Sequence, residues 1–433
     1  MFQLYDSSRR RICLAGFVLF GLVPMATSVV WCVARHLPQH LAAEKARLQR
    51  QFGLDVTLPG LTHVRPGVVR YERLELADPE TGKPLFGCQE LLAESTTQTD
   101  ARGRRRPTLV LTAVRPEVRT EGIERLAELL HRALRREAGY PAGDVRLVAD
   151  EVAIGTGQDA WTLRELRASL EQLADGAQAQ VAFRLPESEA REPVRLRIAR
   201  NRETNPPRSG VELNTGGSEV PCSVLAVGLP AMRAFGSRSR FRGYLWANQT
   251  HDAQAAEHWN AEVTGYLLDL DLERLITERF AHRLSGTGHV EIQQARFRNG
   301  RLESASGRLL AGPGVVSRSL LRAAAEHLRL VEGRAVFAST DLIEYDQLAL
   351  SLLIDADGLT LRGQCGQGRP GTLLTARGEA LLGESPAQPQ PVAALLRALV
   401  PRGDVQVPAT RQTEWLSRHL PLPSARGDGT MRR

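Results

Sequence analysis

Three carboxylates spaced two residues apart are the arrangement in this sequence that comes nearest to a cation site. They are Asp269, Asp271 and Glu273, in the segment LDLDLE. On an extended strand the three side chains would project from one face, and hard cations such as Ca²⁺ bind carboxylate oxygens. The same residues also begin a stretch with helical spacing, where the positive end of the helix dipole stabilises acidic side chains. We favour the helix-start interpretation and predict no metal ligand.

The segment VAIGTGQDA contains part of a dinucleotide-binding fingerprint. Gly155 and Gly157 follow a short apolar run, and Ala160 stands at the third small position. The fingerprint requires these glycines to join a strand to a helix within a βαβ unit, and no convincing helical spacing follows here. We predict a turn between two strands and no cofactor.

Histidine and cysteine show no catalytic or metal-ligand spacing. His251 and His258 flank a loop without an HExxH pattern, and no CxxC pair occurs among the five cysteines. GxSxG, SxxK and phosphate-loop patterns are absent from the sequence as well. We therefore predict no catalytic, cofactor-binding or metal-binding residues, and a protein that is not an enzyme.

The positive charge does not predict a nucleic-acid partner. The formal net charge is +7, and 54 of the 56 basic residues are arginine because lysine occurs only at Lys45 and Lys83. A nucleic-acid protein is expected to gather its basic residues in one patch with interleaved aromatics. Here they are scattered, apart from RGRRR at residues 102–106. We expect no nucleic-acid binding.

An uncharged stretch at residues 12–33 predicts a membrane anchor. Its 22 residues would rise about 33 Å as a helix, enough to cross a hydrocarbon core of about 30 Å. A cleaved signal peptide is the alternative, but its apolar region is typically about 7–15 residues long and ends in a small-x-small site. We favour an uncleaved single-pass anchor, with residues 1–11 in the cytoplasm and the body of the chain on the other side. Residues 34–52 then show helical spacing, and we predict an amphipathic stalk helix.

Beyond the stalk, the apolar period changes from 3.6 to 2, which is typical of half-buried strands. AQAQVAFRL, VRLRI and LALSLLI all alternate in this way. Asn299-Gly300 and Asp357-Gly358 predict hairpin turns between such runs. The residues expected to line one apolar face are Val181, Phe183, Leu185, Val194, Leu196, Ile198, Leu348, Leu350, Leu352 and Ile354.

Some segments depart from simple alternation. Val69 and Tyr71 share one face of a strand while Leu74 and Leu76 share the other, so we predict a bulge near residues 72–73. Trp161–Leu173 fits either helix or strand, and we assign it to a strand. Helical spacing predicts short helices near 120–137, 271–280 and 315–328. Residues 201–219 have the composition of a loop, and residues 384–433 that of a Pro-rich linker, a short helix and a disordered tail.

Four phrases in the sequence show a recurring strand–turn–strand layout. GLDVTLPGLTHVRPGVVRYERLELADPETGKPLF begins at Gly53, and it is followed by FRGYLWANQ, WNAEVTGYLLDLDLERLI and LSGTGHVEIQQARFRNGRLESASGRL. Together with the anchor and stalk, this layout resembles the AsmA-like family of bacterial envelope proteins, as a pattern over most of the chain. The resemblance implies a mainly β fold with a few helices (α+β), in which residues 53–383 form an elongated, curved, open antiparallel sheet with an apolar groove. It also implies a place in the bacterial inner membrane with the body in the periplasm.

The function expected from the resemblance is envelope or outer-membrane biogenesis, or lipid handling, through the groove. A sheet with one apolar face must cover it with helices, a partner or lipid, and the predicted helices are few and short. Covering an acyl chain gains about 0.8 kcal/mol per buried CH₂. We therefore expect a phospholipid or other lipid as ligand. The alternative is a non-enzymatic structural or partner-binding scaffold that binds an envelope protein.

Overall fold

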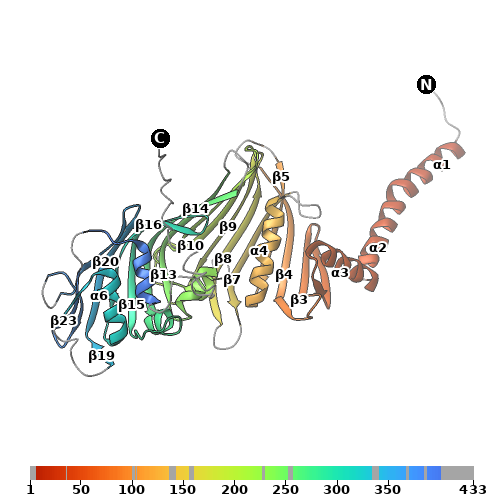
Figure 1. Cartoon of the computed structure of the whole chain (residues 1–433). Helices are drawn as coiled ribbons and strands as arrows, with labels where there is room; N and C mark the ends of the chain where they lie inside the picture. The colour runs from red at the N-terminus through yellow and green to blue at the C-terminus, as the bar shows by residue number, and fades with distance from the viewer. Residues whose placement is uncertain are drawn as a thin grey trace, which may run out of the picture. The chain divides into compact units, whose positions relative to one another are not determined.

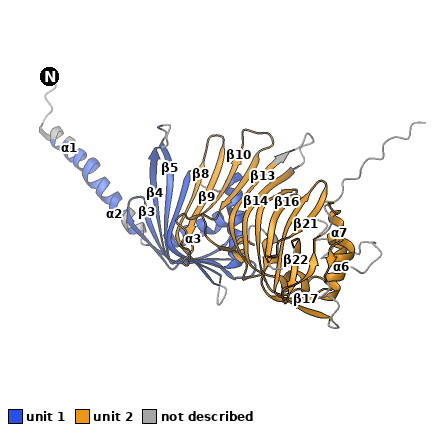
Figure 2. Cartoon of the chain, turned by 90° about the vertical axis from the view of Figure 1, so that its left-hand side faces the viewer, with its two compact units in different colours: residues 1–162 blue, residues 163–433 orange. Residues whose placement is uncertain are grey.

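The structure is a computed structural model that describes residues 6–35, 37–99, 103, 105–135, 143–155, 160–226, 230–251, 257–333, 341–366, 370–384 and 388–400. Strands account for 53% of it and helices for 24%, so the protein is mainly β. The chain divides into two compact units, residues 1–162 and residues 163–433 (Figure 2). Each unit is described by itself below.

Unit 1 begins with an apolar helical segment (Figure 1). It consists of α1 (Asp6–Phe17), the π-helical turn η1 (Val18–Leu22) and α2 (Val23–Arg35). The π turn has a local cause: Pro24 has no N–H to donate, and the Val23 N–H bonds to the Val18 carbonyl five residues back. Cys13–Val30 is long and apolar enough to cross a membrane, and none of it is buried. This helix is consistent with a membrane anchor and equally with a signal sequence.

The predicted stalk helix is present as α3 (Pro38–Phe52), which ends at Gly53 in the left-handed conformation. Its apolar face, including Leu41, Leu48 and Phe52, packs against the first of three hydrophobic cores, called core A. The strands that supply core A are β1 (Asp55–Thr57), β3 (Val68–Ala77) and β4 (Pro84–Thr99). The helical spacing of apolar residues on α3 therefore serves packing against the sheet.

The unit 1 sheet is antiparallel except at one crossover. β1 and β2 (Gly60–Arg65) both pair with β3, which pairs with β4; β4 then pairs with β5 (Arg105–Val114) and β6 (Glu117–Val118). β7 (Asp144–Ile154) runs parallel to β5 and β6. The parallel step is made by α4 (Thr120–Arg135), which lies against β4. A Cβ on Gly122 would come within 2.3 Å of the Leu85 carbonyl oxygen, so glycine allows this close approach.

Unit 2 is dominated by a long antiparallel meander (Figure 2). Its strands are β8 (Trp161–Gln172), β9 (Gly176–Arg184), β10 (Val194–Asn201), β11 (Arg208–Asn214), β13 (Arg240–His251), β14 (Glu257–Asp271), β15 (Thr287–Arg298), β16 (Arg301–Ala311) and β20 (Gln347–Asp355). Each pairs with the next in this order. β20 also pairs with β21 (Gly358–Gly363) and β22 (Thr372–Ala376), and β22 pairs with β23 (Glu379–Gly383).

Insertions between the strands of the meander supply the helices of unit 2. β12 (Val220–Pro221), α5 (Cys222–Leu225) and η3 (Pro230–Phe235) separate β11 from β13, and the π-helical turn η4 (Glu273–Thr277) follows β14. β17 (Gly314–Ser317), α6 (Arg318–Leu328), β18 (Val331–Glu332) and β19 (Leu342–Tyr345) separate β16 from β20. The final helix, α7 (Val392–Leu399), packs beside α6.

Several predictions from local pattern are confirmed. Trp161–Gln172 is a strand, a helix begins at Thr120, and a short helix follows residue 391. The helix expected at 315–328 begins only at Arg318, because Gly314–Ser317 forms β17. The predicted helix at 271–280 is reduced to η4. Asn299 and Gly300 both have positive φ in the β15–β16 hairpin, as a type I′ turn requires. Residues 401–433 lie outside the described residues.

Two predictions need correction. Residues 208–214 were expected in a loop and form β11, because Val211 and Leu213 alternate within a segment otherwise rich in loop-forming residues. Near residues 72–73 the β3–β4 register is the same on both sides, so no residue is inserted. Instead Arg73 has a φ of 48°, and this left-handed residue brings Tyr71 and Leu74 to the same core.

Candidate functional site

The residues predicted to line an apolar face lie on one face of the unit 2 sheet. In β9 and β10, Val181 lies opposite Leu196 and Phe183 lies opposite Val194. The same register continues across the meander to the four residues of β20, while Leu185 follows the end of β9. We call this side of the sheet the apolar face.

Ten strands contribute one residue each to a first apolar row across this face. The row is the set of residues that the strand register places opposite one another: Ala168, Val181, Leu196, Leu213, Leu245, Val263, Ala295, Ala305, Ile354 and Leu359. Every member is apolar although the strands come from separate parts of the sequence. At about 4.8 Å per strand, the row would extend about 43 Å.

A second apolar row runs beside the first, two residues along each strand from β8 to β15 and three along β16, where the register shifts. It comprises Leu170, Ala179, Ile198, Val211, Ala247, Ala261, Phe297 and Leu302. Rows separated by two residues lie about 6.7 Å apart. The two rows therefore form a continuous apolar band on β8 to β16.

The β20 end of the first row is covered by two helices. α6 and α7 contribute Leu321, Leu328, Val392 and Ala398 to a core, called core C, that contains Leu348 and Ile354 of β20. Leu350 and Leu352 pack against the same core. The predicted lining residues of β20 are thus covered by helices of the chain itself.

Another core, called core B, covers part of the apolar face on β10 to β15. It contains Val194, Leu213, Leu245 and Val263, and α5 and η3 pack against it through residues such as Leu225 and Phe235. Phe183, Leu185 and Leu196 pack against core B as half-buried residues. Core B therefore contains the middle members of the first row.

The second row on β8 to β14 belongs to none of the three cores. Its members there are Leu170, Ala179, Ile198, Val211, Ala247 and Ala261, and Val181 of the first row is likewise outside the cores. Ala179 is 3% exposed, and the other six residues are half-buried. We call these seven residues the apolar strip. Of the predicted lining residues, Val181 and Ile198 lie in it.

Five members of the strip are not among the expected lining residues, although Ala179 belongs to the alternating run AQAQVAFRL. Leu170 belongs to a segment whose spacing also fits a helix, and Val211 to a segment with the composition of a loop. Ala179, Ala247 and Ala261 carry little hydrophobic signal individually. The signal available for Val211 was its alternation with Leu213, between Pro207 and Asn214.

The opposite face of the same strands is polar and ion-paired. Arg197 lies 3.9 Å from Glu212, Arg296 lies 3.8 Å from Glu262, and the Gln294 amide donates to Glu262 at 2.7 Å. The Arg242 guanidinium lies 5.0 Å from the centre of the Tyr266 ring. These ion pairs therefore lie on the face opposite the two apolar rows.

The described residues with potential metal or cofactor chemistry take part in local structure. Asp271 Oδ1 accepts the N–H groups of Glu273 and Arg274 at the start of η4, which confirms the helix-start interpretation. Gly155 is followed by strand β8, with residues 156–159 outside the description, so the dinucleotide interpretation lacks its helix. Among the described residues, no group of three or more His, Cys, Asp or Glu could hold a metal ion.

The remaining candidate residues serve local structure. His258 Nδ1 lies 2.6 Å from the Asn299 amide in the β14–β15 region, and the His251 side chain lies outside the described residues. Burial raises the pKa of the Cys222 thiol to about 12 and, although the thiol accepts a backbone N–H, that of Cys88 to about 11. Thiols with raised pKa values are poor nucleophiles at neutral pH. Arg102 and Arg104 of the basic cluster lie outside the described residues.

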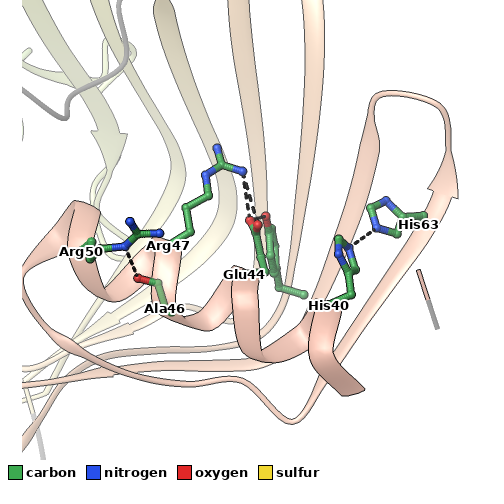
Figure 3. A network of polar contacts seen from close by, with 7 residues as sticks. His40, Glu44, Ala46, Arg47, Arg50 and His63 are labelled. Atoms are coloured by element: carbon green, nitrogen blue, oxygen red, sulfur yellow. Dashed lines mark hydrogen bonds and ion pairs between the residues drawn. The ribbon is translucent and has the colours of Figure 1, made fainter. Parts of the chain in front are cut away.

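Unit 1 contains a polar network that joins α3 to its sheet (Figure 3). His40 Nε2 lies 3.0 Å from His63 Nε2 of β2, and the Tyr71 hydroxyl donates to Glu44 Oε1 at 3.0 Å. Arg47 approaches the same carboxylate at 3.4 Å. Burial, with the nearby Glu44 carboxylate, raises the pKa of Tyr71 well above its usual value. The network joins α3, the helix after the apolar segment, to β2 and β3.

Comparisons with known proteins found no matching family model, no matching curated protein and no matching solved structure.

Proposed function

We propose that this chain is an AsmA-like envelope protein, anchored in the bacterial inner membrane, that handles lipid through the apolar face of its unit 2 sheet in outer-membrane biogenesis. In this proposal the sheet is an elongated, curved, open groove and the body lies in the periplasm. The function is binding or movement of lipid, without enzymatic chemistry.

The observation that supports it most directly is the apolar strip. The two rows continue the same apolar chemistry over β8 to β16, yet the strip on β8 to β14 lies outside the cores that the helices of unit 2 complete. Hydrocarbon in water carries a free-energy cost that scales with its area, so a ligand that covers the strip gains binding free energy. A lipid chain matches this surface because the strip offers no polar side chain.

The apolar N-terminal helix supports the membrane part of the proposal. A chain tethered beside a bilayer meets lipid at high local concentration, since tethering converts a bimolecular encounter into an intramolecular one. The tether and the strip together suit a protein that receives lipid from the membrane that holds it.

The test is mass spectrometry of lipid retained by the full-length protein after purification in detergent. We expect lipid with the wild type, loss of lipid with Ile198→Glu, and retention with Ala199→Glu. Ala199 is the neighbouring residue on the polar face, so its substitution introduces the same charge on the same strand. Purification of a wild-type protein that retains no lipid contradicts the proposal.

A structural or partner-binding scaffold is the second candidate. The observation that favours it is the cover that α6 and α7 provide over β20, since it demonstrates that protein segments fit this face. A photocrosslinker at position 211 distinguishes the two. Crosslinks to one stable protein partner favour the scaffold, and crosslinks to lipid favour lipid handling.

A further inference from the structure

Two histidines from separate segments of the chain meet where α3 contacts β2 (Figure 3). His40 lies in the first turn of α3 and His63 lies in β2, and their Nε2 atoms are 3.0 Å apart. The ring centroids are 5.2 Å apart, and the ring planes are tilted by 34°. The helix and the strand therefore direct the same ring nitrogen of each histidine toward one point.

The distance between the two nitrogens suits two ligands of one metal ion. An imidazole nitrogen binds Zn²⁺ at about 2.0–2.1 Å. Two nitrogens at that distance from one ion are about 2.9 Å apart in a right-angled arrangement and about 3.3 Å apart in a tetrahedral one. The observed 3.0 Å lies between these values. Rotation of the rings then suffices to admit an ion, and the helix and strand keep their separation.

The same contact can also be a hydrogen bond, and the two states differ by a tautomer. A hydrogen bond needs an N–H on one Nε2 and a lone pair on the other, whereas metal binding needs a lone pair on both. Neutral imidazole carries its proton on either nitrogen. A change of tautomer in one ring therefore converts the hydrogen-bonded pair into a pair of ligands without loss of a proton.

The surroundings of the pair suit a hydrated cation. Both imidazoles are half-buried, so water can reach the ion and complete its coordination. The Arg65 guanidinium of β2 donates to Glu94 at 2.7 Å, and Arg47 of α3 lies 3.4 Å from Glu44. These ion pairs reduce the repulsion between the arginines and a cation. Glu44 also lies one turn after His40 on the same face of α3, where its carboxylate attracts a cation.

We propose that His40 and His63 bind one divalent transition-metal ion, such as Zn²⁺ or Ni²⁺, which clamps α3 to β2. Imidazole is a common ligand of these metals, whereas Ca²⁺ and Mg²⁺ prefer oxygen ligands. Among the described residues no group of three or more ligating side chains occurs, so water occupies the remaining positions. The sequence does not reveal the pair, because the two histidines are 23 residues apart. This inference is independent of lipid handling.

The first experiment is isothermal titration calorimetry of the full-length protein in detergent, without a polyhistidine tag and after removal of metal by a chelator. We expect one Zn²⁺ or Ni²⁺ ion per chain with the wild type. Loss of an outer-shell partner already weakens metal binding about 10–100-fold, so His40→Gln and His63→Gln should each weaken it about tenfold or more. His289→Gln changes an exposed histidine of β15 and should keep the wild-type affinity.

The second experiment measures the thermal unfolding midpoint. A ligand of the folded state raises the midpoint, and at tenfold excess over the dissociation constant we expect a rise of about 3 °C or more. His40→Gln should show no rise. Glutamine retains an amide that can hydrogen-bond to His63, so this variant should fold, and circular dichroism checks that it does. Ca²⁺ and Mg²⁺ at the same concentration should leave the wild-type midpoint unchanged.

A measurement on the wild type alone locates the ion. Zn²⁺ should protect His40 and His63 from modification by diethyl pyrocarbonate, mapped by mass spectrometry, and should leave the modification of His289 unchanged. A wild type that binds neither metal overturns the proposal. Unchanged affinity in both His40→Gln and His63→Gln, equal stabilisation by Mg²⁺, or modification of the pair at the same rate with and without Zn²⁺ also overturns it.

Discussion

Ile198 of β10 and Val211 of β11 lie directly opposite each other, and neither belongs to a hydrophobic core. Two residues along each of these strands, Leu196 lies opposite Leu213. Leu213 is 5% exposed and belongs to core B. Neighbouring cross-strand pairs of similar chemistry thus differ in what covers them. Truncation of the two side chains should therefore lower the free energy of unfolding by different amounts.

Truncation to alanine should separate the two positions. Leu213→Ala removes a buried side chain and leaves a cavity, so we expect it to lower the free energy of unfolding by about 2–5 kcal/mol. Ile198→Ala removes a half-buried side chain outside the cores and should cost about 1 kcal/mol or less. Urea unfolding of the lipid-stripped protein measures both. Equal losses would show that the strip is packed as tightly as core B.

The contact between Tyr71 and Glu44 should stabilise the docking of α3 on unit 1. Tyr71 is buried and its hydroxyl donates to a carboxylate, and hydrogen bonds to charged groups contribute about 1.5–3 kcal/mol. We expect Tyr71→Phe to lower the free energy of unfolding by about that amount. A double-mutant cycle with Glu44→Gln isolates the pair, and additive losses would contradict a direct interaction.

Local chemistry predicted much of this fold because it acts over a few residues. The alternation of Leu348 to Ile354 predicted a strand, and Asn299-Gly300 predicted a turn, since both depend on neighbouring backbone and side chains. β11 was missed because its loop-like composition outweighs two apolar residues. The α4 crossover to parallel β7 was missed because pairing partners are set by distant segments.

The cover over each strand could not be predicted from alternation. Ile198 and Ile354 have the same pattern in the sequence, yet Ile354 lies in core C and Ile198 lies outside every core. The cover depends on where α6 and α7 pack, and their sequences specify only that each has an apolar side.

The β15–β16 hairpin should depend on Asn299. Its φ is 53°, and its Oδ1 accepts the N–H of Trp259 at 2.9 Å. A left-handed conformation costs a residue other than glycine or asparagine about 1–2 kcal/mol, so Asn299→Ala should destabilise by at least that amount. Asp357→Ala in the β20–β21 hairpin is the control, because Asp357 does not have a positive φ. A similar loss in both variants would contradict the role of φ.

The N-terminal helix should stay on the mature protein. Its apolar stretch extends over Cys13–Val30 and none of it is buried, which suits a helix surrounded by lipid. We expect the intact mass of protein purified from membranes to correspond to the uncleaved chain, and the protein to remain in membranes after alkaline carbonate extraction. A mass that lacks the first thirty or so residues would identify a signal sequence and remove the anchor from the proposed function.

His282 should make the stability of unit 2 depend on pH. It is 2% exposed; its Nε2 lies 3.0 Å from the Ala398 carbonyl of α7 and its Nδ1 lies 2.9 Å from Ser319 Oγ of α6. Burial lowers the pKa of His282, against the opposing effect of the hydrogen bond to Ala398. The unfolded chain therefore binds a proton more readily than the folded chain, and stability falls as pH drops below about 6.5, the usual histidine value.

The free energy of unfolding, measured from pH 7.5 to 5, should decline less in His282→Gln than in the wild type. Arg322→Gln, an exposed change on α6, should keep the wild-type decline, and parallel curves for His282→Gln and the wild type would contradict the assignment.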